Sequence, residues 1–301
     1  MMVAMVLLCS CREQVPTDSR PSSLKGQSTR FVIDDIGRSV TVPVEITRVV
    51  STAPSVTENI FAVTAGDRLV GVTTFCNYPE EAKSVAKIGD TMTPNMESII
   101  ALKPDIVFVT TASQIESFTK TLERNGIAVY VTNPTSLDEV FNGLDNLADL
   151  LWYGVGDRTP GSLLVPVLKR RVGEVWKKVE GEKKVRVFVQ ISKEPLFTIG
   201  KQSFLNAVII NAGGESVTAN VDSAYPKLSK ETASALNPEA IILSESDDNR
   251  EPNDAFKNSP AVKNGRVYKV NADILSRPGP RLVDALEQIA KNLHPEKFRN
   301  N

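Results

Sequence analysis

Histidine and cysteine are scarce in this chain, whose 301 residues include one histidine, His294, and three cysteines. A single histidine excludes histidine-cluster metal sites and argues against a histidine-based catalytic triad or dyad. A large charge of either sign is also missing, because 35 basic side chains face 36 acidic ones. Such a balance leaves no global field to hold a nucleic acid or a membrane surface. Any partner must therefore be bound by local features.

The apolar run near the start of the chain, Met2 to Leu8, is too short to cross a bilayer as a helix, for which ~20 residues are needed. It is the length of a secretory signal core, and the sequence Leu8-Cys9-Ser10-Cys11 resembles a bacterial lipobox. That resemblance implies lipidation of Cys11 and a flexible tether up to residue 28. The other interpretation is an unprocessed hydrophobic tail, because no lysine or arginine precedes the run. With Cys11 acylated, Cys76 remains as the unmodified cysteine, so we expect no intramolecular disulfide.

From about Phe31 the chain alternates short β-branched runs with longer helical stretches. This alternation is typical of an α/β protein with largely parallel sheets. Strands are predicted at 49–51, 69–72, 106–109, 128–131, 185–190, 240–243 and 266–270.

Two strings of sequence occur twice, in the same order. Glu97-Ser-Ile-Ile-Ala-Leu-Lys-Pro-Asp105 has the same pattern as Glu231-Thr-Ala-Ser-Ala-Leu-Asn-Pro-Glu239, and each is followed by a predicted strand. Further on, Asn125-Gly126 and Asn264-Gly265 recur at a similar offset. The repetition predicts two lobes of like topology.

Helix starts are predicted from capping boxes at Ser55-Val-Thr-Glu58 and Ser136-Leu-Asp-Glu139. Between the lobes, residues 157–181 carry apolar side chains at near-helical spacing, which predicts one long connecting helix and modest closure on ligand. Pro166 is expected in the first turn of that helix or at a kink. The predicted organisation is a signal and tether at 1–28, a lobe at 29–156, the helix at 157–181 and a second lobe at 182–301.

The loops that follow the predicted strands carry aromatic and charged side chains. In open α/β sheets such loops face the crevice in which ligands bind, so we expect a cleft between the lobes. Aromatic rings there suit a flat, large, partly apolar ligand. The charged pair Asp273 and Arg277 is expected to orient polar edges of that ligand, whereas Arg281 is expected to cap or pair at the start of the last helix.

Several stretches together resemble the helical-backbone (class III) periplasmic binding proteins of ABC importers, and among them the vitamin B12 binders. They are Arg48-Val-Val-Ser-Thr-Ala-Pro-Ser55, Gly71-Val-Thr-Thr-Phe-Cys-Asn-Tyr-Pro79, the repeated Glu…Ala-Leu-x-Pro and Arg277-Pro-Gly-Pro-Arg281. The resemblance covers about 31–297 and implies two α/β lobes, a rigid inter-lobe helix and a cleft that holds cobalamin or another corrinoid. It implies ligand contacts at Phe75, Phe197, Tyr225, Asp273 and Arg277, and we expect Tyr78 and Thr91, on loops that face the same cleft, to contact the ligand as well. Thr91 and Thr110 stand where those proteins can have tryptophan, so the aromatic cage is thinner here.

Glu97 and Glu231 are predicted to lie in the first turns of their helices, after the caps Asn95 and Ser229. The helix dipole favours a carboxylate at that position, which by itself explains either residue. Matching glutamates in the resembling family dock onto arginines of a dimeric permease. The resemblance therefore implies that Glu97 and Glu231 dock this chain onto an ABC permease that works with an ATPase.

Three functions remain open. The first is a lipid-anchored receptor, outside the cytoplasmic membrane, that delivers a corrinoid to a permease. The second keeps the fold and changes the ligand to haem, with Tyr78 or Tyr225 as an axial ligand, or to a ferric siderophore held by Arg277. The third is a two-domain enzyme, which the absence of Gly-x-Ser-x-Gly, Gly-x4-Gly-Lys and strand-linked Gly-x-Gly-x-x-Gly motifs argues against. The first interpretation requires no metal site, no cofactor and no nucleic acid. An acidic loop at 245–251 is interpreted as solvated rather than as a cation site.

Overall fold

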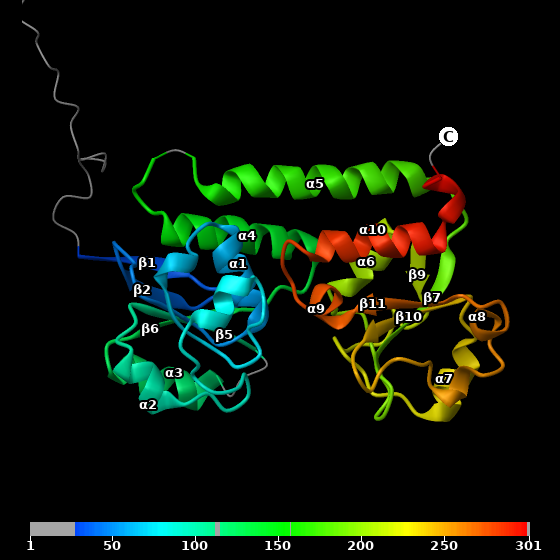
Figure 1. The fold of residues 1–301 in the computed structure, drawn as a ribbon, viewed down its shortest axis with the longest axis horizontal. Helices are drawn as coiled ribbons and strands as arrows, with labels where there is room; N and C mark the ends of the chain where they lie inside the picture. Colours follow the sequence, from blue (N-terminus) through cyan, green and yellow to red (C-terminus); the bar gives the residue numbers. More distant parts are fainter. Residues whose placement is uncertain (1–27, 112–114, 157, 300–301) are drawn as a thin grey trace, which may run out of the picture.

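Two α/β lobes lie side by side beneath one long helix, α5 (Pro160–Val179), in a computed structural model that describes residues 28–111, 115–156 and 158–299 (Figure 1). The predicted lipidation site, Cys11, lies outside these residues. None of the helices in the described residues is long and apolar enough to cross a bilayer.

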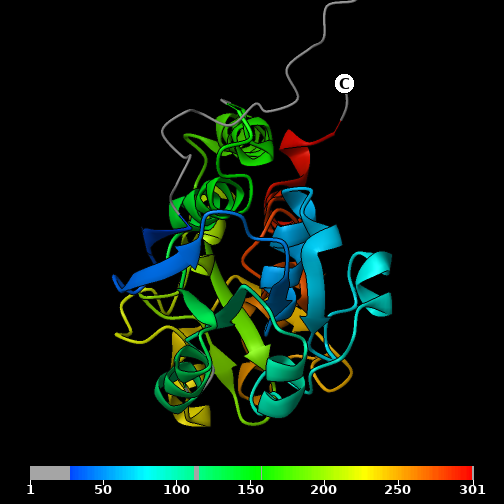
Figure 2. The same cartoon turned by 90° about the vertical axis from the view of Figure 1, so that its left-hand side faces the viewer.

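The N-terminal lobe is built on a parallel four-stranded sheet. Its strands, in spatial order, are β4 (Leu69–Val72), β3 (Val49–Ser51), β5 (Ile106–Thr110) and β6 (Ala128–Thr132). One side carries α1 (Pro54–Ala62) and α4 (Leu137–Leu151), and the other carries α2 (Met96–Ala101) and α3 (Ile115–Arg124). An antiparallel hairpin, β1 (Thr29–Ile33) and β2 (Ser39–Pro43), stands beside this sheet (Figure 2).

The C-terminal lobe repeats this plan on a five-stranded sheet. Its strands are β11 (Val267–Asn271), β10 (Ala240–Glu245), β7 (Val185–Ser192) and the antiparallel β8 (Phe197–Thr198), with β9 (Gly214–Ser216) also paired to β7. Its helices are α6 (Leu205–Asn211), α7 (Lys230–Leu236), α8 (Pro260–Lys263), α9 (Ala272–Leu275) and α10 (Leu282–Leu293). The α/β class, the parallel sheets and the two lobes are confirmed, as are all seven predicted strands, to within two residues at each end.

The repeated Glu…Ala-Leu-x-Pro-acid string builds the same substructure in both lobes. Arg48 donates to the carbonyl oxygens of Leu102 and Lys103 after α2, and the Asp105 carboxylate accepts from the backbone N–H of Arg48 at 2.9 Å. In the second lobe Arg186 donates to the carbonyls of Leu236 and Asn237, and Glu239 accepts from the backbone N–H of Arg186 at 3.0 Å. Each acid therefore fixes the arginine that satisfies the open carbonyls of a helix C-terminus. The repetition in sequence is a repetition of this helix-to-strand joint.

The residue before the repeated proline has a left-handed backbone in both lobes, with φ +45° at Lys103 and +47° at Asn237. Asparagine tolerates this conformation better than lysine does. The second repeated string also has one conformation, because Gly126 and Gly265 have φ of +73° and +65° and end α3 and α8. Glycine at that position is the common way to stop a helix.

Helix α5 begins earlier than Pro166 suggested. Thr159 caps it by accepting from the backbone N–H of Ser162, and Pro160 occupies the first turn, where a missing N–H costs nothing. Pro166 lies inside the helix, which excludes the first-turn alternative; the kink alternative stays a prediction. Buried Val165, Leu168 and other side chains of α5 pack on the lobes and compensate for the lost hydrogen bond. The predicted division of the chain at 156/157 and 181/182 falls just outside α5 and remains a prediction.

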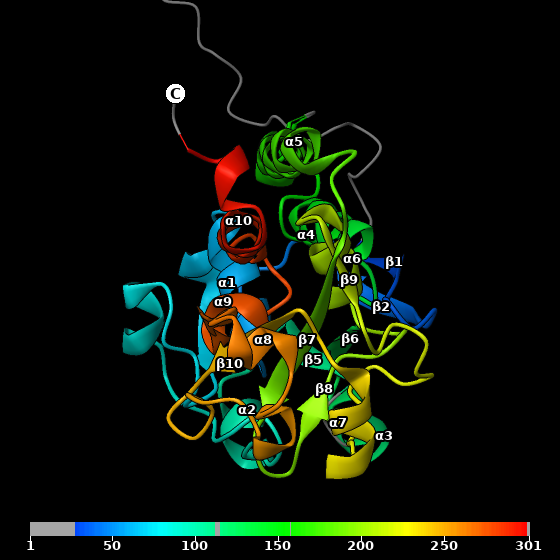
Figure 3. The same ribbon diagram turned by 90° about the vertical axis from the view of Figure 1, so that its right-hand side faces the viewer.

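One hydrophobic cluster runs through both lobes under α5. It joins Leu144 and Ala148 of α4 to Leu168 of α5 and to Leu205 of α6 and Leu286 of α10. Figure 3 shows α5 above α4, α6 and α10. Because packed cores deform little, this shared cluster holds the two lobes together more firmly than a helix alone.

The two predicted capping boxes had different outcomes. Ser136 caps α4 by accepting from the backbone N–H of Glu139 at 3.2 Å, as predicted. The Glu139 carboxylate reaches back one residue further than expected and accepts from the backbone N–H of Thr135 at 2.6 Å. At α1 the prediction is wrong, because the helix starts at Pro54 and Ser55 lies inside it. Glu58 is thus not a capping residue, and its carboxylate bonds across to the other lobe.

Candidate functional site

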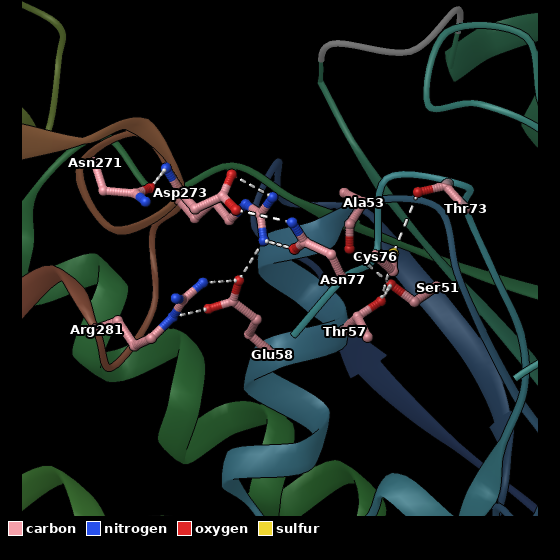
Figure 4. Close-up of polar contacts among 11 residues, drawn as sticks. Ser51, Ala53, Thr57, Glu58, Thr73, Cys76, Asn77, Asn271, Asp273 and Arg281 are labelled. Carbon is pink, nitrogen blue, oxygen red and sulfur yellow. Dashed lines mark hydrogen bonds and ion pairs between the residues drawn. The ribbon is translucent and has the colours of Figure 1, made fainter. Parts of the chain in front are cut away.

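The carboxyl ends of strands from the two lobes meet at one junction. β3 leads into α1, which carries Glu58, and the loop after β4 carries Asn77. From the other lobe β11 leads into α9 with Asp273, followed by Arg277 and Arg281. These five residues, called here the junction cluster, are bonded to one another across the lobes (Figure 4).

Glu58 is the centre of the junction cluster. Its side chain is 3% exposed and accepts three hydrogen bonds from two arginines of the other lobe. Arg277 Nη1 donates to Oε1 at 2.7 Å, and Arg281 donates through Nε to Oε2 at 2.8 Å and through Nη2 to Oε1 at 2.6 Å. Arg281 therefore binds both carboxylate oxygens in a bidentate pair, which is the strongest geometry for an arginine and a carboxylate.

Arg277, Asp273 and Asn77 close a ring beside Glu58. Arg277 Nη2 donates to Asp273 Oδ1 at 2.6 Å, which confirms the predicted charged pair. Arg277 Nη1 donates to Asn77 Oδ1 at 2.8 Å, and Asn77 Nδ2 donates to Asp273 Oδ2 at 2.9 Å. Each lobe thus orients the polar groups of the other.

Tyr78 extends the junction towards solvent. The guanidinium of Arg281 lies 3.9 Å from the centre of the Tyr78 ring, which leaves that side chain 46% exposed. Burial by itself lowers the pKa of Arg281, and the Glu58 carboxylate outweighs it, so the pKa is raised above its usual value. Arg281 stays charged, pairs at the start of α10 as predicted, and supports an aromatic ring that the sequence analysis placed in the site.

A buried polar chain fixes the loop that carries Asn77 and Tyr78. Cys76 is 2% exposed, and its Sγ lies 3.1 Å from Thr57 Oγ1 and 3.2 Å from Thr73 Oγ1. Thr57 Oγ1 in turn donates to Ser51 Oγ at 2.9 Å. Because Thr57 precedes Glu58 on α1, the loop and the helix are held in one arrangement (Figure 4).

The remaining predicted ligand residues are distributed over segments of both lobes. Phe75 is 58% exposed one residue before Cys76, and Thr91 is partly buried on the loop before α2. Phe197 lies in β8, and Tyr225 lies near it, because Thr198 donates its backbone N–H to the carbonyl of Pro226 at 3.1 Å. Tyr225 is 40% exposed, and burial of its hydroxyl, which bonds to Ser203, raises its pKa. Whether these residues bind ligand remains a prediction.

Glu97 and Glu231 occupy the places predicted for them. Each is exposed in the first turn of its helix, after the caps Asn95 and Ser229, which accept from the backbone at 2.9 and 3.1 Å. Hydrogen bonds from its own backbone N–H and from Ser229 lower the pKa of Glu231, so it is ionised at neutral pH. Helices α2 and α7 lie on the side of their lobes opposite α5 (Figure 1). The two helices that carry these glutamates thus lie on one side of the molecule.

Acidic groups elsewhere are paired or dispersed. Asp247 bonds to Arg250 at 2.6 Å, and Glu245 lies 3.8 Å from Lys269. Within the described ranges no three histidine, cysteine, aspartate or glutamate side chains are grouped as a metal site would need.

Comparison with known proteins identifies the family to which this chain belongs. The sequence profile described as periplasmic binding protein matches residues 49–274, three quarters of the chain. The chain belongs to the periplasmic binding proteins. It is 31% identical, over 99% of its length and 96% of the relative's, to the uncharacterised ABC transporter substrate-binding lipoprotein YvrC of Bacillus subtilis. It is 30% identical to the vitamin B12-binding protein of Vibrio parahaemolyticus, over 85% of this chain and 91% of that one.

Solved structures agree with this family. The periplasmic vitamin B12 binding protein BtuF of Vibrio cholerae superposes with a TM-score of 0.70 at 28% identity, over 84% of this chain and 99% of that one. The haem-binding protein BhuT superposes with a TM-score of 0.71 at 21% identity, over 83% and 98%, which supports the fold alone. This periplasmic binding protein is thus a substrate-binding component of the ABC-transporter kind, homologous to B12-binding proteins, and its family serves transport.

Glu58 and Asn77 were not predicted from the sequence as site residues. Glu58 was assigned to a capping box because Ser-x-x-Glu fits that pattern, although Pro54 already marked the first turn. Asn77 lies within the stretch Gly71 to Pro79, but it is uncharged and its residue type did not distinguish it from its neighbours. Two arginines in Arg277-Pro-Gly-Pro-Arg281 needed a counter-charge, and this was the signal that could have led to Glu58.

Proposed function

We propose that this periplasmic binding protein captures cobalamin or a related corrinoid at the lobe junction and delivers it to an ABC permease without transforming it. The single observation that carries the proposal is the 30% identity to a vitamin B12-binding protein over 85% of the chain. The junction supports it chemically, because a corrinoid has a large flat face and an edge of polar amides. Exposed Phe75 and Tyr78 suit the face, and Asn77, Asp273 and Arg277 suit the edge.

Titration calorimetry of the full chain, with Cys11→Ser to prevent lipidation, tests the ligand. We expect saturable one-to-one binding of cyanocobalamin and cobinamide. Haem and a ferric hydroxamate siderophore, titrated in parallel, should bind far more weakly. Tight binding of haem or siderophore with none of the corrinoids would overturn the proposal.

Haem is the second candidate because two exposed tyrosines, Tyr78 and Tyr225, could offer a phenol oxygen to iron. Tyr78 also stacks on the guanidinium of Arg281, which orients its ring at the junction. A tyrosinate charge-transfer band after mixing with haem, lost in Tyr78→Phe or Tyr225→Phe, would favour this candidate over the corrinoid.

We further propose that Glu97 and Glu231 dock onto the permease. Both are exposed, and both lie on helices at the side away from α5. Charge pairs of this kind steer encounter and set the register of a complex. Charge reversal of both to arginine should abolish cobalamin uptake by cells that depend on this protein, with calorimetric affinity unchanged. Reversal of the exposed Glu174 and Glu180, on and just after α5, is the matched control, and equal loss of uptake there would contradict the docking role.

The proposed location is the outer side of the cytoplasmic membrane, through a lipid on Cys11. Metabolic labelling with an alkyne fatty acid should mark the full chain and not Cys11→Ser. Labelling of both would contradict this anchor.

A further inference from the structure

The four charges of the junction cluster cancel one another. Glu58 and Asp273 contribute −2, and Arg277 and Arg281 contribute +2, which sum to zero. Within the described part of the chain, the ion pairs of these four side chains are made only among themselves. No arginine of the cluster therefore offers an uncompensated charge to a ligand.

The outer edge of the cluster is neutral or acidic. Asp273 is 36% exposed and Asn77 is exposed, whereas the side chains of Arg277 and Arg281 are only 14% and 20% exposed. A carboxamide fits this edge, because its N–H groups can be donated to the Asp273 carboxylate while its oxygen accepts from Arg277 or Asn77. A carboxylate has no proton to donate and would face Asp273 with a like charge.

We propose that Glu58 is a specificity-determining residue. Because it neutralises the charges of Arg277 and Arg281, the junction selects ligands with neutral carboxamide edges over ligands with carboxylate edges. This inference rests on the proposed corrinoid function. Beyond that function, a buried residue of the opposite lobe determines whether the ligand edge that binds is neutral or charged. Glu58 acts through the arginines and, at 3% exposure, does not itself need to touch the ligand.

Two corrinoids that differ in side-chain charge test the proposal on the full Cys11→Ser chain. Cobinamide carries carboxamide side chains on its corrin ring, and cobyrinic acid carries carboxylates in their place. Calorimetry at pH 7 and low salt should show cobinamide bound roughly tenfold more tightly, because a like-charge contact in an interface is costly and water at the partly exposed Asp273 reduces that cost to about one decade of affinity. The ratio should shrink as salt is added.

Glu58→Gln leaves the cluster with a net charge of +1 and should lower the ratio of the two affinities by roughly tenfold. Arg281→Gln leaves it at −1 and should raise the ratio, so the two variants are predicted to move it in opposite directions. The ratio is measured within each variant, which removes any common effect on lobe position. Asp284→Asn, which removes a partner of Arg171 on the α5 side of α10, should leave the ratio unchanged.

The outcomes separate this inference from the function on which it rests. If the unmutated chain binds neither corrinoid, the proposed function is wrong. If it binds both equally at low salt, or if Glu58→Gln and Arg281→Gln fail to move the ratio in opposite directions, the function stands and the role of Glu58 is wrong. Should Glu58→Gln not fold, the rise expected for Arg281→Gln decides alone.

Discussion

Truncation of Glu58 should cost this protein more stability than loss of any exposed ion pair. Glu58→Ala removes three charge-assisted hydrogen bonds of 2.6 to 2.8 Å and leaves two arginines without their shared counter-charge. Breaking a buried pair by removing one partner costs about 3–5 kcal/mol. Because Arg277 and Arg281 are 14% and 20% exposed, water can reach them in part, and we expect about 3 kcal/mol.

The assay is urea unfolding followed by far-UV circular dichroism, with the free energy of unfolding extrapolated to water. Asp284→Ala is the control, because Asp284 also pairs with an arginine, Arg171, but is 49% exposed and should cost less than about 1 kcal/mol. A loss below 1 kcal/mol for Glu58→Ala, or an equal loss in both variants, would refute the reasoning that burial makes this carboxylate important. A fall in the slope of the unfolding curve would indicate instead that the lobes unfold separately.

Three further predictions follow from other parts of the molecule. Lys103→Asn should raise the free energy of unfolding by about 0.5–1 kcal/mol, since the left-handed backbone there suits asparagine better, and a stability unchanged or lowered in urea titration would count against it. The hydrogen bond from the backbone N–H of Arg186 lowers the pKa of Glu239, so the folded-state pKa of this carboxyl lies below its unfolded-state value. The stabilisation that Glu239 contributes is therefore fully present above the unfolded-state pKa and is lost as the pH falls through the folded-state pKa. Stability measured from pH 6 to pH 3 should therefore fall less steeply in Glu239→Gln, and parallel curves would contradict this. Phe75→Ala should weaken cyanocobalamin binding about tenfold, whereas Phe31→Ala on the β1–β2 hairpin should not, although Phe31 is 76% exposed and Phe75 58%; equal calorimetric affinities for the two variants would remove Phe75 from the site.

The two-lobe architecture is readable from the sequence because its signals are local and repeated. Each predicted strand is a short β-branched run bounded by a turn or a helix cap, so neighbouring residues suffice to find it. The repeated string from Glu97 to Asp105 and from Glu231 to Glu239 reports a joint whose contacts lie within one lobe. Strands β8 and β9 were missed because they have two and three residues, and β1 and β2 because they form an antiparallel hairpin outside the alternation of strands and helices.

The sequence by itself determined the family, seven of the strands, the long connecting helix and the first-turn positions of Glu97 and Glu231. Only the tertiary structure decided the role of Glu58, because its partners Arg277 and Arg281 lie more than 200 positions away. The Ser-x-x-Glu pattern reads the same whether the glutamate caps its own helix or bonds to another lobe, so the neighbouring residues of that pattern do not distinguish the two. The choice is made by Pro54, which moves the helix start, and by two arginines that folding brings to a buried carboxylate, where pairing is worth far more than a cap on the surface.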